Sequence, residues 1–154
     1  MDETRIEAIS QYRMVDQLLA TSGQPTEAQL AALARAGFGA VINLALHDDP
    51  RYSLPDEPGL VQSLGMAYVH IPVAFAAPQE SDLLAFCDAM EKNQGQKLLV
   101  HCAANMRVSA FLGLYRAIKQ GLPDDEAFAL MNSIWEPSPV WAAFIESMLQ
   151  KHRV

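Results

Sequence analysis

The sequence predicts an α/β protein with a central parallel-rich sheet of about four to five strands, flanked by helices on both faces. Two short runs, residues 40–44 (AVINL) and 98–101 (LLVH), are almost wholly apolar, as is typical of buried parallel strands. Apolar side chains recur at helical spacing after the second run, from Val108 to Ile118. Strands that alternate with helices in this way favour a sheet covered on both sides.

The amino-terminal part supplies the sheet edge and the first helix. Residues 11–22 alternate loosely between polar and apolar side chains, which predicts one or two strands at the edge. A turn at residues 23–25 follows. Thr26 and Gln29 then form a capping box that opens a helix, and Gly37 ends it.

The middle of the chain predicts a loop, a short helix, a strand and a longer helix. Residues 47–58 are polar and contain prolines, so we expect an exposed loop. A short helix is expected over 59–64, a strand over 66–71 and a helix over about 79–93. Cys87 shares a face of that last helix with other apolar side chains, so it is interpreted as a core residue rather than a redox partner of Cys102.

The carboxyl-terminal part adds further helices. Gly121 and Pro123 close the helix that follows residues 98–101. Acidic residues 124–126 are suited to the first turn of the next helix, where negative charge complements the helix dipole. Pro137 and Pro139 then precede a final amphipathic helix.

Size and composition exclude several classes of protein. A chain of 154 residues, 51% of them hydrophobic, favours one domain over residues 1–154. The net charge of −7 argues against nucleic acid as a partner, and no apolar stretch is long enough to cross a membrane. Without a signal-peptide pattern, a soluble cytoplasmic protein is expected. Nothing in the sequence indicates the oligomeric state.

The stretch from residue 97 to residue 120 contains the candidate chemistry. Cys102 follows the strand 98–101 directly, and four small or flexible residues separate it from Arg107 and the helix. The unpaired amides and positive dipole end of a helix stabilise an anion in the preceding turn. A thiol placed there beside a cation becomes a nucleophile at neutral pH. Arg107 offers a planar fork of donors for two phosphate oxygens.

These residues resemble the cysteine-dependent (dual-specificity-like) protein tyrosine phosphatase superfamily, whose loop reads His-Cys, five residues, Arg, then Ser or Thr. His101, Cys102 and Ser109 coincide with that loop, whereas Val108 stands at the arginine position and Arg107 comes one residue early. One residue is about 100° of helical rotation. Arg107 therefore either points away from a phosphate or, if the helix starts later, closes over it.

The resemblance implies the roles of the site residues. Cys102, Arg107, Ser109 and His101 would be catalytic, with the Ser109 hydroxyl donating to the thiolate leaving group. The phosphate-binding residues would be Ala103, Ala104, Asn105, Met106 and Arg107. Asn105 stands where the superfamily usually has Gly, and Asn tolerates φ > 0 better than most residues.

A second resemblance covers residues 22–44, SGQPTEAQLAALARAGFGAVINL, which look like the opening of the bacterial beta-lactamase hydrolase-like phosphatase family. Together the two resemblances imply a phosphatase-like fold and hydrolysis of a phosphate monoester, on a protein or a small molecule, through a phosphocysteine intermediate.

The proton donor that this mechanism needs is not evident. The superfamily carries an aspartate on the loop after the third strand, where this chain has residues 74–77, AFAA. Loss of a general acid costs about 10² to 10⁴ in rate, so a slow enzyme is expected. Asp48, Asp49, Glu80 and Asp82 are the possible substitutes, and each is also explained as a solvated or helix-start residue.

No cofactor or metal is indicated. His47, His70 and His101 all follow strand ends, but none has the i, i+4 spacing of a ligand pair on one helix. Two other functions stay open: a non-catalytic pseudophosphatase that binds a phosphate or another oxyanion, and a thiolate sulfurtransferase.

Overall fold

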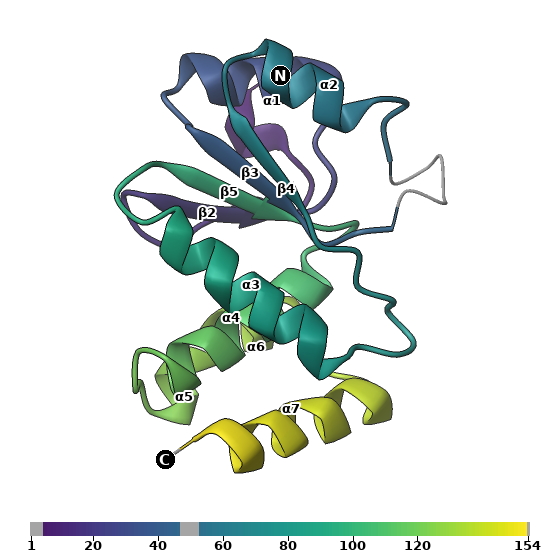
Figure 1. Cartoon of the computed structure of the whole chain (residues 1–154), viewed down its shortest axis with the longest axis vertical. Helices are drawn as coiled ribbons and strands as arrows, with labels where there is room; N and C mark the ends of the chain where they lie inside the picture. Colours follow the sequence, from purple (N-terminus) through teal and green to yellow (C-terminus); the bar gives the residue numbers. More distant parts are fainter. Residues whose placement is uncertain (1–4, 47–52, 154) are drawn as a thin grey trace.

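The computed structural model describes residues 5–46 and 53–153. Its sheet has five strands in the order β1-β2-β5-β3-β4, all parallel except β1, which runs antiparallel to β2 (Figure 1). The strands are β1 (Arg13–Met14), β2 (Leu19–Ser22), β3 (Ala40–Asn43), β4 (Ala67–His70) and β5 (Leu98–His101). The predicted α/β class, strand number and parallel character are confirmed.

Helices cover both faces of the sheet (Figure 1). One face carries η1 (Ile6–Ala8), α1 (Glu27–Arg35) and α2 (Glu57–Ser63). The other face carries α3 (Glu80–Lys92), α4 (Met106–Ile118), α5 (Asp124–Ala127), α6 (Ala129–Ile134) and α7 (Pro139–His152). No helix in the described residues is long and apolar enough to cross a lipid bilayer.

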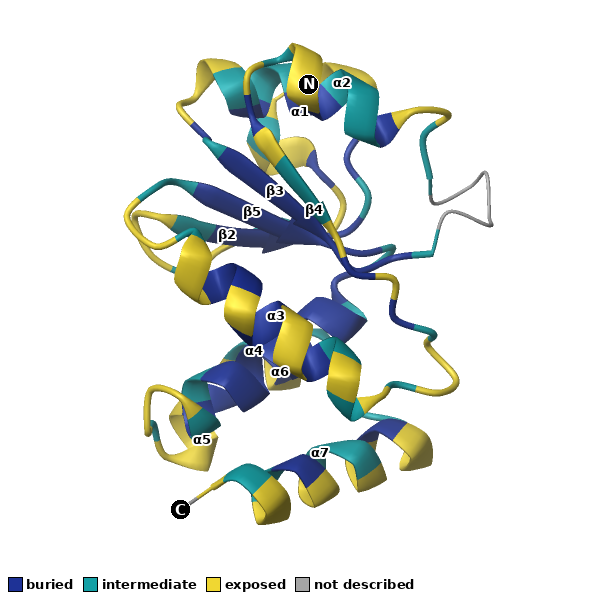
Figure 2. Cartoon of the chain, viewed as in Figure 1, coloured by how far each residue is buried: buried dark blue, intermediate teal, exposed yellow. Residues whose placement is uncertain are grey.

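The core is split in two by the sheet, because successive side chains of a strand point to opposite faces. Val41 and Leu99 pack with Leu30 of α1, while Val100 packs with Phe111 of α4 in the second cluster. The three parallel strands in the middle are buried except for the half-buried Leu19 at the start of β2, and the outer sides of the helices are exposed (Figure 2). This two-faced burial explains the nearly continuous apolar runs of β3 and β5.

Local signals placed most elements correctly. Thr26 and Gln29 form the capping box of α1, with the Gln29 amide 3.1 Å from the Thr26 hydroxyl oxygen, and Gly37 has φ of +94°. Cys87 of α3 is buried in the core, as predicted. Residues 11–22 form β1 and β2, but β2 is an inner strand because it pairs with β5.

One boundary prediction was wrong. Residues 47–58 were expected to form an exposed loop, yet α2 already begins at Glu57, and the Glu57 side chain is fully buried. Asp56 caps the helix by accepting from the Gly59 amide at 3.1 Å. Pro58 fits the first turn, where a missing N–H costs nothing. Residues 47–52 lie outside the described residues.

The packing of α4 yields a stability prediction. A Cβ added at Gly113 would lie 2.2 Å from Cδ1 of Phe128. Helix propensity alone favours Ala over Gly by about 1 kcal/mol, whereas overpacking costs about 1 to 3 kcal/mol. Gly113→Ala should therefore lower the free energy of unfolding, measured by urea denaturation.

The same substitution made in a Phe128→Ala background is the control, because the clash with the Phe128 ring is then absent. Gly113→Ala should therefore destabilise the Phe128→Ala variant less than it destabilises the wild type. A wild-type or raised denaturation midpoint for Gly113→Ala alone would contradict this account of the packing.

Candidate active site

Cys102 lies at the carboxyl end of β5, on the face of the sheet covered by α3 to α7. Val100 points to the same face, while Leu99 packs in the cluster on the opposite face. The Cys102 amide donates to the Ser22 carbonyl at 3.3 Å, and only 1% of the residue is exposed. The thiol therefore lies at the carboxyl-terminal edge of the parallel sheet, where α/β proteins bind their ligands.

Residues Cys102–Asn105, here called the cysteine turn, join β5 to α4. Asn105 adopts the left-handed conformation with φ of +65°, as the predicted tolerance of Asn allows. Its Nδ2 donates to the Gln11 carbonyl at 3.0 Å and to the Thr21 hydroxyl at 2.9 Å. These bonds hold the turn from the β2 side.

Gly23 lets a second segment approach the cysteine turn. The Gln24 amide donates to the Ala103 carbonyl at 3.1 Å, and Gly23 forms a bridge with Ala104. A Cβ at Gly23 would lie 2.5 Å from the Ala103 oxygen, so only glycine fits.

The start of α4 leaves backbone donors unpaired within the helix. The Ser109 amide makes the first helical bond, to the Asn105 carbonyl at 3.1 Å. The amides before it, from Asn105 to Val108, have no carbonyl of their own helix to bond. Together with the helix dipole, such amides stabilise an anion.

Arg107 occupies the first turn of α4, and only 9% of it is exposed. Its Nη1 donates to the Val73 carbonyl at 2.9 Å, and the guanidinium carbon lies 6.0 Å from the centre of the Phe75 ring. The helix begins at Met106, so the later helix start under which Arg107 was expected to close over a phosphate is not found. The side chain instead reaches the loop that follows β4. That loop is the one in which the superfamily resemblance placed the general acid.

The loop after β4 carries an aromatic cluster instead of a carboxylate. The Phe75 ring lies 5.8 Å from that of Trp135 and 5.9 Å from that of Trp141, and Trp141 Nε1 donates to the Phe75 carbonyl at 2.7 Å. Phe75 itself is 40% exposed. An apolar surface therefore stands next to the guanidinium of Arg107.

The Ser109 hydroxyl makes two hydrogen bonds within the protein. Its hydroxyl donates to the Met106 carbonyl at 3.0 Å and accepts from Trp135 Nε1 at 3.1 Å. The role that the resemblance implied for Ser109, donation to a thiolate, requires the hydroxyl to rotate away from Met106.

His101 points to the opposite face from Cys102, toward α2. Its Nε2 lies 2.6 Å from Oε2 of Glu57, and its Nδ1 lies 3.3 Å from the Cys102 carbonyl oxygen. Neither His101 nor Glu57 is exposed to solvent. Gln24 Nε2 donates to the other Glu57 oxygen at 2.7 Å. A buried polar layer therefore lies directly behind the cysteine turn.

Tyr68 of β4 belongs to the same layer. Asn43 Nδ2 donates to the Tyr68 hydroxyl at 3.1 Å. Burial, and next the negative charge of Glu57, raise the pKa of the Tyr68 phenol above its usual value. Tyr68 thus stays protonated.

The possible proton donors are occupied elsewhere or lie outside the described residues, as Asp48 and Asp49 do. Glu80 accepts from Lys151 at 2.7 Å and pairs with His152 at 2.6 Å, and these hydrogen bonds hold the pKa of Glu80 below its usual value. Asp82 caps α3 by accepting from the Gln79 amide. Glu80 is thus an ion-pair partner rather than an acid.

The histidines that follow strand ends do not converge. His70 Nε2 lies 2.6 Å from the Ala45 carbonyl oxygen, and His101 is paired with Glu57. His47 lies outside the described residues. Within the part of the chain that the structure describes, no group of three metal-ligating side chains is found.

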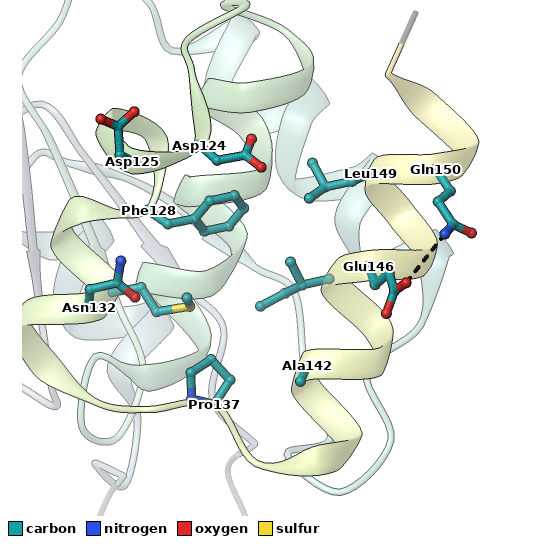
Figure 3. A pocket seen from close by; sticks show the side chains of 11 residues that line it. Asp124, Asp125, Phe128, Asn132, Pro137, Ala142, Glu146, Leu149 and Gln150 are labelled. Carbon is teal, nitrogen blue, oxygen red and sulfur yellow. Dashed lines mark hydrogen bonds between the residues drawn. The ribbon is translucent and has the colours of Figure 1, made fainter.

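A separate cavity of about 520 Å³ lies between α7 and the segment formed by α5 and α6 (Figure 3). Its lining includes the apolar side chains of Phe128, Ile145 and Leu149 and the carboxylates of Asp124, Asp125 and Glu146. None of its lining residues belongs to the cysteine turn.

Sequence reasoning missed three residues of this region. Glu57 was assigned to a loop, although its position beside Pro58 fits the first turn of a helix. Phe75 was mentioned only as one of the residues 74–77, which lack the aspartate expected in that loop. Trp135 gave no periodic signal, because it follows α6 in an extended conformation.

Comparison with known proteins identifies the family. Residues 4–138 match the family described as DSP-PTPase phosphatase fused to NAD+ kinase. A beta-lactamase hydrolase-like protein of Xylella fastidiosa (strain Temecula1) is 31% identical over 122 residues, which cover 75% of this chain and 27% of the relative. The chain thus spans about a quarter of the length of the curated relatives it matches.

Solved structures agree. A putative phosphatase (DUF442) from Shewanella putrefaciens CN-32 superposes with a TM-score of 0.85 at 34% identity, covering 99% of this chain and 100% of that one. Tk-PTP in its active form has a TM-score of 0.76 at 24% identity, covering 92% and 97%, which shows the shared fold. The chain therefore belongs to the DSP-PTPase family of phosphatases, and its fold is that of the cysteine-dependent protein tyrosine phosphatases.

Proposed function

We propose that this chain hydrolyses phosphate monoesters through a phosphocysteine intermediate on Cys102. The observation that carries the proposal is the placement of a lone thiol between the end of β5 and the amino terminus of α4, with Arg107 in the first helical turn. In this proposal the thiol is the nucleophile, and the amides at the start of α4 and Arg107 bind the phosphate. Family membership supports the same chemistry.

In the first step the Cys102 sulfur attacks phosphorus, and the bond from phosphorus to the ester oxygen breaks. The negative charge of the transferring group is balanced by the amides at the start of α4 and by Arg107. In the second step water attacks the phosphocysteine, which releases inorganic phosphate and the thiolate. The Ser109 hydroxyl, after rotation, donates to that thiolate.

The step without an evident catalyst is protonation of the leaving oxygen. The loop after β4 offers Phe75 and alanines, while Glu80 and Asp82 have other partners. The reaction should therefore be slow for poor leaving groups, by about 10² to 10⁴ relative to an enzyme with a general acid. p-Nitrophenyl phosphate, whose nitrophenoxide is stable enough to leave without a proton, is the preferred test substrate.

Cys102→Ser should reduce hydrolysis of p-nitrophenyl phosphate to the background rate, because a serine hydroxyl in this turn is a far weaker nucleophile than a thiolate. Steady-state release of p-nitrophenolate measures it. Cys87→Ala is the control, since Cys87 is the second cysteine and lies in the core within α3. Equal activity in Cys102→Ser and wild type would exclude the phosphocysteine.

The same variants separate the other functions. A pseudophosphatase would bind vanadate without turnover, would keep that binding in Cys102→Ser, and would lose it in Arg107→Ala. A sulfurtransferase would form a persulfide on Cys102 when incubated with thiosulfate, which mass spectrometry detects.

Arg107→Lys should lower kcat/KM by about tenfold to a hundredfold, because an ammonium cannot make the two-pronged contact and each charge-assisted bond is worth about 1.5 to 3 kcal/mol. One N–H of the guanidinium already serves the Val73 carbonyl, and the others are available to an oxyanion. Arg116→Lys, in the last turn of the same helix, is the matched control. Unchanged kinetics in Arg107→Lys would remove this side chain from the site.

The pH profile of kcat/KM should rise to a plateau and stay there above neutrality, since no assigned acid has to remain protonated. Glu80 fits this expectation, because its lowered pKa keeps it ionised across that range. Glu80→Gln should therefore leave the profile unchanged. A bell-shaped profile would reveal a proton donor, and Asp48 and Asp49 would be tested next.

A further inference from the structure

The buried pair of Glu57 and His101 lies behind the candidate active site, on the side of the sheet away from the thiol, and the mechanism above makes no use of Glu57. Both side chains are fully buried and 2.6 Å apart. Burying two ionisable groups is costly unless each is well hydrogen-bonded. His101 directly precedes Cys102 in the chain, so the pair adjoins the backbone of the cysteine turn.

The hydrogen bonds of His101 fix where its protons lie. A carbonyl oxygen only accepts, so the contact between Nδ1 and the Cys102 oxygen requires a proton on Nδ1. The opposite nitrogen, Nε2, faces a Glu57 oxygen, and one further proton is shared between these two atoms. Glu57 therefore selects the form of His101 that donates to the Cys102 carbonyl.

The direction of that carbonyl decides the direction of the next amide. The Cys102 oxygen and the Ala103 N–H belong to one planar trans peptide unit, in which C=O and N–H point in opposite directions. Because His101 draws the oxygen toward the α2 face, the Ala103 N–H points toward the face of the sheet on which Cys102 lies. This is the side on which an oxyanion would meet the thiol.

We propose that Glu57 is a positioning residue: acting through His101, it orients the peptide between Cys102 and Ala103 so that the Ala103 amide donates to the bound oxyanion. The proposal rests on the anion-binding site of the proposed function. It assigns to α2, on the opposite face of the sheet, a part in binding phosphate.

The chain offers variants that separate this role from simple packing. Glu57→Gln keeps the pattern: its amide oxygen accepts from Gln24, and its NH₂ donates to Nε2 of a neutral His101 that still carries the proton on Nδ1. Glu57→Ala removes the hydrogen bonds to both Gln24 and His101. The double variant Glu57→Leu/His101→Phe replaces the pair with apolar groups of similar size, a change that buried ion pairs often tolerate.

Tyr68→Phe is the matched control. It removes a hydroxyl that hydrogen-bonds Asn43 and Glu57 in the same buried layer, and it leaves the contact between Glu57 and His101 in place. A loss of stability in this variant measures the cost of disturbing the layer alone, and its phosphate affinity should equal that of wild type.

The experiment is a titration of ¹⁵N-labelled protein with inorganic phosphate, followed at the Ala103 amide by NMR. We expect a downfield shift of this amide proton in wild type, Glu57→Gln and Tyr68→Phe. In Glu57→Ala and in the double variant the shift should be lost and the affinity should fall by about tenfold or more, the worth of one charge-assisted hydrogen bond.

Wild-type affinity and an unchanged Ala103 shift in the folded double variant would overturn the proposal, and so would a loss in Glu57→Gln as large as in Glu57→Ala. Because the titration needs no turnover, phosphate binding without hydrolysis would refute the phosphatase and leave the role of Glu57 standing. Hydrolysis by the wild type, together with equal phosphate affinity in all variants, would support the phosphatase and refute the role of Glu57.

Discussion

The structure depends on one constraint: the chain must leave the middle strand of a parallel sheet and enter a helix within four residues, with a thiol at the start of that turn. Asn105 meets the constraint by adopting a left-handed conformation, which costs a non-glycine residue about 1 to 2 kcal/mol. Hydrogen bonds from its side chain to Gln11 and Thr21 offset that cost. The turn is thus held in place before any ligand arrives, as an anion site made of backbone amides requires.

The sheet divides the surroundings of this turn into two unlike halves. On the face of Cys102 lies α4, whose Arg107 reaches Val73 in the loop after β4, and Phe75 of that loop packs against Trp135. On the opposite face the turn meets the buried polar layer of Glu57 and His101. The alternation of side chains along β5 separates the groups that would touch an oxyanion from those that hold the backbone.

Much of this arrangement could be predicted from local patterns, because those patterns have local physical causes. The strands β3 and β5 are apolar since both of their faces are buried, and Thr26 with Gln29 marks the start of α1 through its own hydrogen bonds. The position of Cys102 between strand and helix followed from the same reasoning.

Other features depend on contacts between distant segments and left no local signal. Glu57 lies in a polar stretch that contains prolines, and its burial depends on partners far away in the sequence, Gln24 and, 44 residues away, His101. The reach of Arg107 to Val73 depends on how the loop after β4 folds back over α4. The contact of Trp135 with Ser109 likewise joins two elements by tertiary packing.

The central claim is that the sulfur of Cys102 carries the phosphoryl group during turnover. Acid quenching during hydrolysis of p-nitrophenyl phosphate, followed by mass spectrometry of the peptide that contains Cys102, measures this directly. We expect a phosphorylated Cys102 that disappears once the substrate is exhausted. Continued product release from a protein whose Cys102 stays unmodified at every time point would contradict it.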